Sequence, residues 1–161
     1  MGLIKIVCLA LVFSFANVKT MRNTYFSAAQ NEELLGDFQK TINNYKKSDQ
    51  LYYCYLSAFY SLESKFASGL SKKLEFFKSS KTYLEKSLSI KETLDAHFIR
   101  FCIQTNAPSI LNYKSEIPTD KKYILNHLKN ESDQEFKQKI KEFLLASKEV
   151  SKTEKESLKN I

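Results

Sequence analysis

The chain has 161 residues and a formal net charge of +7, and 43% of its residues are hydrophobic. This length fits one domain with a sizeable hydrophobic core and excludes two full domains. Only three glycines and two prolines are present, which is little turn material for an all-β fold, so the composition favours an all-α protein.

The N-terminal stretch has the pattern of a secretory signal peptide. Lys5 precedes an apolar run over residues 6–15, and Ser14 and Ala16 are small residues at the spacing that a signal peptidase accepts. We expect cleavage after Ala16 and therefore a periplasmic or secreted protein. In the alternative interpretation the segment is retained as a membrane anchor, but a spanning helix needs about 20 apolar residues and this run ends before Asn17.

The first amphipathic pattern after the signal lies within residues 23–47. Its apolar positions fall at steps of four, four and three and predict one helical face, formed by Leu34, Phe38, Ile42 and Tyr45.

The clearest helical pattern in the chain covers residues 51–66. Gly69 follows it and suits the left-handed conformation that ends a helix. A second amphipathic pattern covers residues 70–88. The two segments therefore predict an antiparallel helical hairpin.

The next helix is expected to start near Ile90, because Ser89 and Glu92 have the spacing of a capping box. Pro108 is expected to end it, since the residue before a proline is disfavoured in helical geometry. This leaves Ala107–Pro118 as the long irregular segment of the chain.

The C-terminal part is expected to form further helices. Thr119 can cap a helix that includes Tyr123–Leu128. Two more capping boxes have their hydroxyl residues at Ser132 and Ser151, with Glu135 and Glu154 as partners.

Together these patterns predict about five to seven helices. We divide the chain into a signal peptide over residues 1–16, a single helical domain over 17–145 and a charged helical tail over 146–161 that frays at its end.

The distribution of charge indicates a solvated surface. Lysines are scattered in pairs among carboxylates, as at Lys46-Lys47 and Lys72-Lys73, whereas a nucleic-acid footprint concentrates its charge on one stripe. We expect no nucleic-acid partner and no strong membrane binding after signal cleavage.

Residues for common catalytic chemistry are scarce. His97 and His127 are the only histidines and lie on different predicted helices, so we expect no metal site. The glycines are Gly2, Gly36 and Gly69, which excludes a glycine-rich phosphate loop. We predict no cofactor, no catalytic residue and no enzymatic activity.

Two cysteines, Cys54 and Cys102, remain after signal cleavage. An exported protein enters a compartment in which paired thiols oxidise. A disulfide and two buried free thiols are both compatible with the sequence.

Arg100 is one of only two arginines, and it lies between two apolar residues of a predicted helix. The favoured interpretation is a structural clamp that ties the 107–118 loop to this helix through backbone carbonyls. In the alternative, Arg100 binds a ligand anion. Gln104, Asn106 and Tyr113 are expected in the same polar cluster.

Aromatic residues cover more of the 51–66 helix than one buried stripe requires. Tyr53 and Tyr60 are candidates for a surface that holds a partner's peptide. The alternative is that these tyrosines fill a helix–helix seam with their hydroxyls at the edge.

The spacing of large and small residues in this hairpin resembles the tetratricopeptide repeat, with an insertion in the 66–77 region. The residues that carry the resemblance are Tyr53, Leu56, Ser57 and Tyr60, read with Ser80, Leu84 and Ser87.

A second resemblance covers roughly residues 50–130 and is to a family of small exported proteins of Gram-negative bacteria. Its motif residues are Ile99-Arg100-Phe101, Ile103-Gln104, Asn106-Ala107-Pro108, Leu111, Tyr113, Ile117 and Asp120. The resemblance implies export and a helical hairpin, and it implies no catalytic residue.

We therefore expect a degenerate tetratricopeptide-like array that binds or scaffolds another envelope protein or peptide. The expected contacts are the Tyr52–Tyr60 surface and the Arg100 cluster. The alternative function is a small-ligand receptor or enzyme centred on Arg100 and the 107–118 loop.

Overall fold

The computed structural model describes residues 18–161, so the predicted signal peptide lies outside the described residues. The described part is all-helical, which confirms the expected fold class. It forms eight α-helices, one more than the five to seven expected, and two short 3-10 helices. A helical segment over residues 18–30 and a short 3-10 helix, η1 (Glu32–Leu34), come first. They are followed by α2 (Leu35–Asn43), α3 (Gln50–Phe66), α4 (Leu70–Ile90), α5 (Leu94–Asn106), η2 (Ser109–Leu111), α6 (Ile117–Leu128), α7 (Gln134–Ala146) and α8 (Lys152–Lys159).

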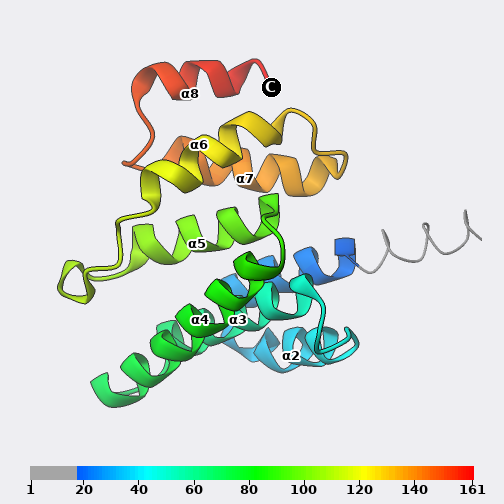
Figure 1. Cartoon of the computed structure of the whole chain (residues 1–161), viewed down its shortest axis with the longest axis vertical. Coiled ribbons are helices and arrows are strands. Elements are labelled where there is room, and N and C mark those ends of the chain that lie inside the picture. Colours follow the sequence, from blue (N-terminus) through cyan, green and yellow to red (C-terminus); the bar gives the residue numbers. More distant parts are fainter. Residues whose placement is uncertain (1–17) are drawn as a thin grey trace, which may run out of the picture.

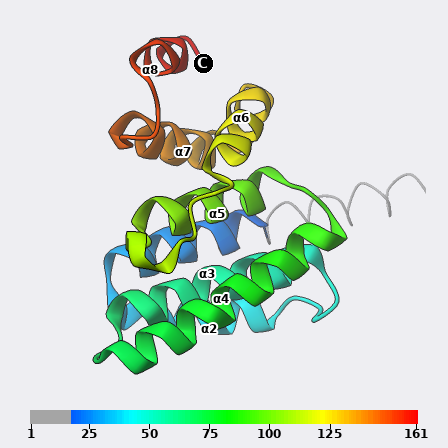
Figure 2. The ribbon, with the colours of Figure 1, turned by 60° about the vertical axis from the view of Figure 1, so that its left-hand side comes forward.

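The helices are stacked along the longest axis of the molecule. Helices α2, α3 and α4 lie at one end, α5 lies next to them, and α6, α7 and α8 follow toward the other end (Figures 1 and 2). No helix among residues 18–161 is long and apolar enough to cross a membrane.

The prediction of a single helix within residues 23–47 is wrong. The chain leaves the first helical segment at Asn31, whose side chain caps η1 by accepting a hydrogen bond from the Glu33 amide. This break shifts the apolar stripe, so that Leu35 enters the core while Leu34 stays 36% exposed.

The predicted antiparallel hairpin is confirmed as α3 and α4, which make the most extensive helix pairing of the described chain. Gly69 does not end α3 as expected, because α3 stops at Phe66 with Ala67 as its cap. Gly69 instead precedes the first residue of α4, with φ +86°, a region that L residues rarely adopt. Small residues let the two helices approach closely. The Ser57 and Ser80 hydroxyls lie 3.2 Å apart, and the Ser80 hydroxyl also donates to the Ser57 carbonyl.

The helix start expected near Ile90 is also wrong, because α4 continues through Ile90 and α5 begins at Leu94. Ser89 does not cap a helix, since its hydroxyl donates to the Lys86 carbonyl within α4. Thr93 is the cap: its backbone is extended and its hydroxyl accepts from the Ala96 amide at 3.2 Å.

Pro108 ends α5 as expected, with the last helical residue at Asn106. The irregular segment is shorter than predicted, because α6 begins at Ile117 with a proline in its first turn. Thr119 lies inside α6 and is not its cap.

The cap of α7 is Asp133, one residue after the predicted Ser132, and its carboxylate accepts from the Phe136 amide. The capping box of Ser151 with Glu154 is confirmed at the start of α8. The segment expected to fray contains this helix, and its Leu158 side chain is completely buried.

Thr93→Ala should remove the cap of α5 and lower the free energy of unfolding by about 1 kcal/mol. Ser89→Ala is the matched control and should change it by less than about 0.5 kcal/mol, because this hydroxyl only bonds within α4. Urea unfolding of the purified variants measures both values. A larger loss for the Ser89 variant would contradict the placement of the cap at Thr93.

Candidate functional site

Helix α5 is the most buried helix of the described chain, since every residue from Asp95 to Gln104 is buried. Four of these residues are polar: Asp95, His97, Arg100 and Gln104. A buried polar group needs hydrogen-bonding partners. The structure supplies them in two clusters, which involve different neighbours of α5.

The first cluster surrounds the carboxylate of Asp120 on α6, which is completely buried. Arg100 donates from Nη2 to Oδ1 at 2.7 Å and from Nε to Oδ2 at 2.9 Å. Gln104 Nε2 donates to Oδ2 at 2.9 Å, and its Oε1 accepts from the Glu116 amide. His97 Nδ1 lies 2.7 Å from Oδ1. We call these four side chains the Asp120 cluster.

The Asp120 cluster is a neutralised ion pair, and it fastens α5 to α6. Burial alone would lower the pKa of Arg100, but its hydrogen bond to Asp120 and the charge of that carboxylate raise it above the usual value. Arg100 therefore stays charged and holds Asp120, in place of the loop carbonyls that we expected. The positive charge of Arg100 is already neutralised by Asp120, so little attraction for a ligand anion remains.

His97 is 1% exposed and packs face to face on Tyr123, with ring centroids 3.7 Å apart. Nδ1 faces the Asp120 carboxylate, which accepts a hydrogen bond when this nitrogen carries a proton. Nε2 is buried without a hydrogen-bond partner, and the nearest ion-pairing group is Glu92 Oε1 at 4.0 Å. No group of three potential metal ligands occurs within residues 18–161.

Two residues expected in this cluster make no hydrogen bond to it. The Asn106 side chain is exposed and donates to the Cys102 carbonyl on its own helix. Tyr113 is buried against Phe77 of α4, with ring centroids 5.5 Å apart, and its hydroxyl makes no hydrogen bond. Burial and the charge of Glu85 raise the pKa of Tyr113.

The second cluster surrounds Asp95 and was not predicted. Arg22 binds its carboxylate with two parallel hydrogen bonds of 2.8 and 2.9 Å, and the Tyr55 hydroxyl donates to it at 2.5 Å. Arg22 also donates to Glu131 at 3.1 Å and to Asp133 at 3.2 Å. The guanidinium thus joins the first helical segment to α5 and the start of α7, and Asp95 adds the link to α3 through Tyr55.

The composition contained a hint that Arg22 has a special role. Only two of the 25 basic residues are arginines, and the structure places both in buried pairs with carboxylates. Arginine suits such places because its planar guanidinium binds a carboxylate with two hydrogen bonds and stays ionised.

An open depression of about 610 Å³ lies beside Arg22, between the start of the first helical segment and residues 131–135. Its carboxylates are already engaged. Glu131 and Asp133 bind Arg22, and Glu135 lies 3.3 Å from Lys19. The depression therefore offers no free carboxylate for a cation.

Some aromatic side chains of α3 lie in the core and others lie at the surface. Tyr52, Tyr55 and Phe59 are buried, as the seam interpretation expects. Tyr53 and Tyr60 are partly exposed, as a binding surface requires.

Tyr53 and Tyr60 form a row of rings with side chains of α4. Tyr83 lies almost parallel to both, with centroid distances of 6.3 Å to Tyr53 and 5.4 Å to Tyr60. Phe76 lies 6.1 Å from Tyr60, and Lys86 Nζ lies 4.1 Å above the Tyr53 ring. We call these five side chains the aromatic face.

Cys54 and Cys102 are buried free thiols. Both thiols lie close enough to the buried Tyr25 of the first helical segment to raise the pKa of its hydroxyl. Burial in turn raises the pKa of each thiol. A raised pKa keeps a thiol protonated and unreactive, so these cysteines serve as core residues.

Asp120→Asn should lower the free energy of unfolding by about 3–5 kcal/mol, because it leaves Arg100 charged and buried without its counter-ion. The exposed pair of Asp37 with Lys40 provides the control, and Asp37→Asn should cost less than about 0.5 kcal/mol. Both values follow from denaturant unfolding. A loss below about 1 kcal/mol for the Asp120 variant would contradict a clamp at this position.

Comparison of the chain with protein-family models, with curated proteins and with solved structures found no match. The resemblances of residues 50–130 to a tetratricopeptide-like hairpin and to small exported proteins remain predictions.

Proposed function

We propose that this chain is an exported helical protein, with no catalytic activity of its own, that binds another envelope protein or peptide. The aromatic face is the binding surface. The observation that carries the proposal is a row of partly exposed, nearly parallel rings across α3 and α4.

Aromatic side chains in such a row are suited to binding. They offer large apolar area and lose little conformational entropy on binding, which is why tyrosine is enriched among residues that dominate binding energy. The hydroxyls of Tyr53, Tyr60 and Tyr83 also have no hydrogen-bond partner among residues 18–161. They remain available to polar groups of a partner.

We give the Arg100 cluster a structural role, as in the favoured interpretation of Arg100, and not the expected role of a contact with the partner. Arg100 is 8% exposed and Gln104 is completely buried, so neither side chain reaches a protein partner. The same burial weighs against a ligand receptor or an enzyme centred there. We assign this cluster to holding the fold that presents the aromatic face.

Export is the second part of the proposal. It rests on the signal pattern that ends at Ala16. The expected cleavage site lies outside the described residues 18–161, so this part of the proposal rests on the sequence pattern alone.

The test is co-purification from the envelope of the producing cells, with the mass of the recovered bait reporting its N-terminus. The wild-type bait should start at Asn17 and should retain a specific partner. The triple variant with Tyr53, Tyr60 and Tyr83 changed to alanine should lose at least about 30-fold of that partner, since truncating one dominant residue costs about 2 kcal/mol or more.

Ile110→Ala is the matched control, because Ile110 is a large apolar side chain that is 91% exposed on η2, outside the aromatic face. It should retain the partner fully. Thermal unfolding must show that all baits are folded. Equal recovery of the partner by the wild type and the triple variant would overturn the proposal.

A further inference from the structure

We infer that His97 is a proton-sensitive link, which in its charged form bridges Asp120 on α6 and Glu92 in the connection between α4 and α5. This inference goes beyond the proposed binding function and does not depend on it, because it concerns the interior of the fold. Its basis is that both ring nitrogens of His97 face a carboxylate, while only one of them is within hydrogen-bond distance.

The first nitrogen, Nδ1, lies 2.7 Å from Asp120 Oδ1. Arg100 and Gln104 hold the same carboxylate in place with their own hydrogen bonds. An ionised carboxylate only accepts hydrogen bonds, and the charged form of histidine carries a proton on both nitrogens. The charged ring therefore fits this side of the site without any rearrangement.

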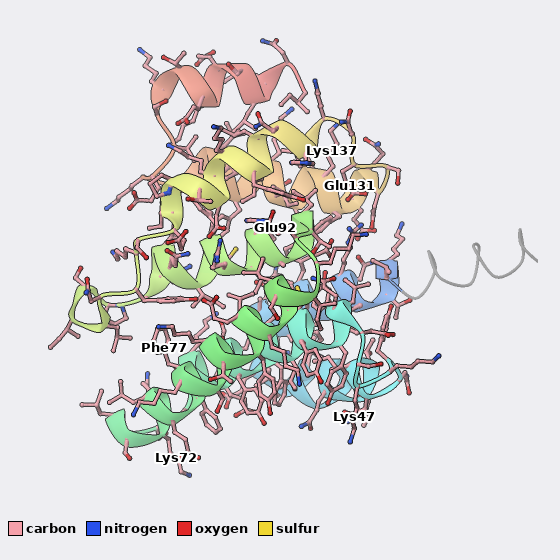
Figure 3. The ribbon with its side chains drawn as sticks, in the orientation of Figure 1. Lys47, Lys72, Phe77, Glu92, Glu131 and Lys137 are labelled. Carbon is pink, nitrogen blue, oxygen red and sulfur yellow. The ribbon has the colours of Figure 1, made fainter. Side chains whose placement is uncertain are left out.

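The second nitrogen, Nε2, is buried and has no hydrogen-bond partner. Glu92 Oε1 lies 4.0 Å away, which is beyond hydrogen-bond distance. The side chain of Glu92 is 67% exposed, so it is free to turn and close this gap. Figure 3 shows Glu92 near the start of α5, beside α6, and its backbone carbonyl accepts from the Tyr123 hydroxyl at 3.4 Å. Glu92 is thus in place to accept a hydrogen bond from a protonated Nε2.

The charges around His97 favour its protonated form. The titratable and charged groups that face its ring are Glu92, Arg100, Asp120 and Tyr123, with His127 behind Tyr123. Asp120 matches the charge of Arg100, which leaves the negative charge of Glu92 beside the ring. Burial opposes a charge on His97. Against this cost stand two charge-assisted hydrogen bonds and the satisfaction of a buried polar atom.

The Tyr123 ring adds to this preference. It lies face to face with His97, with centroids 3.7 Å apart and an angle of 16° between the planes. A cation over the face of a tyrosine is attracted by the ring. His127 covers the opposite face at 3.9 Å, but it is exposed, so solvent screens the repulsion between the two histidines when both are charged.

The link makes the stability of the fold depend on pH. The charged ring meets Asp120 and Glu92 together only in the folded protein, so the folded state holds the added proton more tightly than the unfolded chain does. Stability should therefore increase as the pH falls through about 6.5, where histidines gain their proton, and this gain should be lost as the pH rises again. Acid thereby tightens the contact of α6 with the start of α5.

The experiment measures the midpoint of thermal unfolding at about pH 7.5 and about pH 5.5, on the two sides of the usual histidine range. The change between the two values is compared for the wild type and His97→Asn, which keeps an amide donor and removes the titrating ring. We expect the change to be more favourable to the wild type by about 3 °C or more. Each protein is compared with itself, so a general loss of stability in the variant cancels.

Glu92→Ala tests the bridge itself, and its exposed position makes loss of folding no concern. It should lose most of the acid-dependent gain. Glu75→Ala is the matched control, because Glu75 is an exposed carboxylate in the first turns of α4, at the end away from Glu92. It should keep the gain, as should His127→Gln. If His97→Asn does not fold, the comparison of Glu92→Ala with Glu75→Ala decides.

Three results would overturn the inference. One is the same pH response in the wild type and His97→Asn. Another is a gain that Glu92→Ala keeps in full. The third is a gain that disappears in His127→Gln and persists in His97→Asn, because it would assign the titration to the exposed histidine.

Discussion

Two buried pairs between a guanidinium and a carboxylate make the position of α5 possible. Asp95 and Arg100 lie on the same buried helix, and each would be costly to bury alone. Arg22 neutralises Asp95, and Asp120 neutralises Arg100. Because removing one partner leaves an uncompensated charge in the core, each pair ties its two segments firmly together.

These pairs arrange the rest of the molecule. The Arg22 pair holds the first helical segment against α5 and the start of α7, and the Asp120 cluster holds α6 against α5. Helix α5 thereby joins the α2–α4 end to the α6–α8 end of the stack (Figure 2). The outer side of the α3–α4 hairpin is left with its row of rings, which is the surface to which we assign binding.

Burial separates the role of the Asp120 cluster from the role of the aromatic face. Arg100 and Gln104 have the chemistry of a ligand site, but their donors are used inside the fold. Tyr53 and Tyr60 have simpler chemistry and remain accessible. Accessibility, more than the kind of side chain, therefore decides which group is available to a partner.

Much of the fold could be predicted because it depends on short-range patterns. The apolar stripes of α3 and α4 repeat at helical spacing, and Pro108 marks the end of α5 by backbone sterics. The choice of cap failed at Ser89 and Ser132, since several capping residues stand close together and tertiary packing selects among them.

The carboxylate partners of the two arginines could not be predicted, because they join residues 20 and 73 positions apart. Such contacts depend on how helices pack, and helical spacing along one segment does not specify it. The rarity of arginine marks Arg22 and Arg100 as special, but it does not name Asp95 and Asp120. For the binding surface, the sequence indicated Tyr53 and Tyr60, while Tyr83 and Phe76 emerged only from the pairing of α3 with α4.

Native-state hydrogen exchange of α5 tests the central claim most directly. If the two buried pairs hold this helix at the centre of the fold, the backbone amides of residues 98–104 should exchange only through global unfolding and should be among the slowest in the chain. Amides of α5 that exchange as fast as those of the short C-terminal helix α8 would contradict the account.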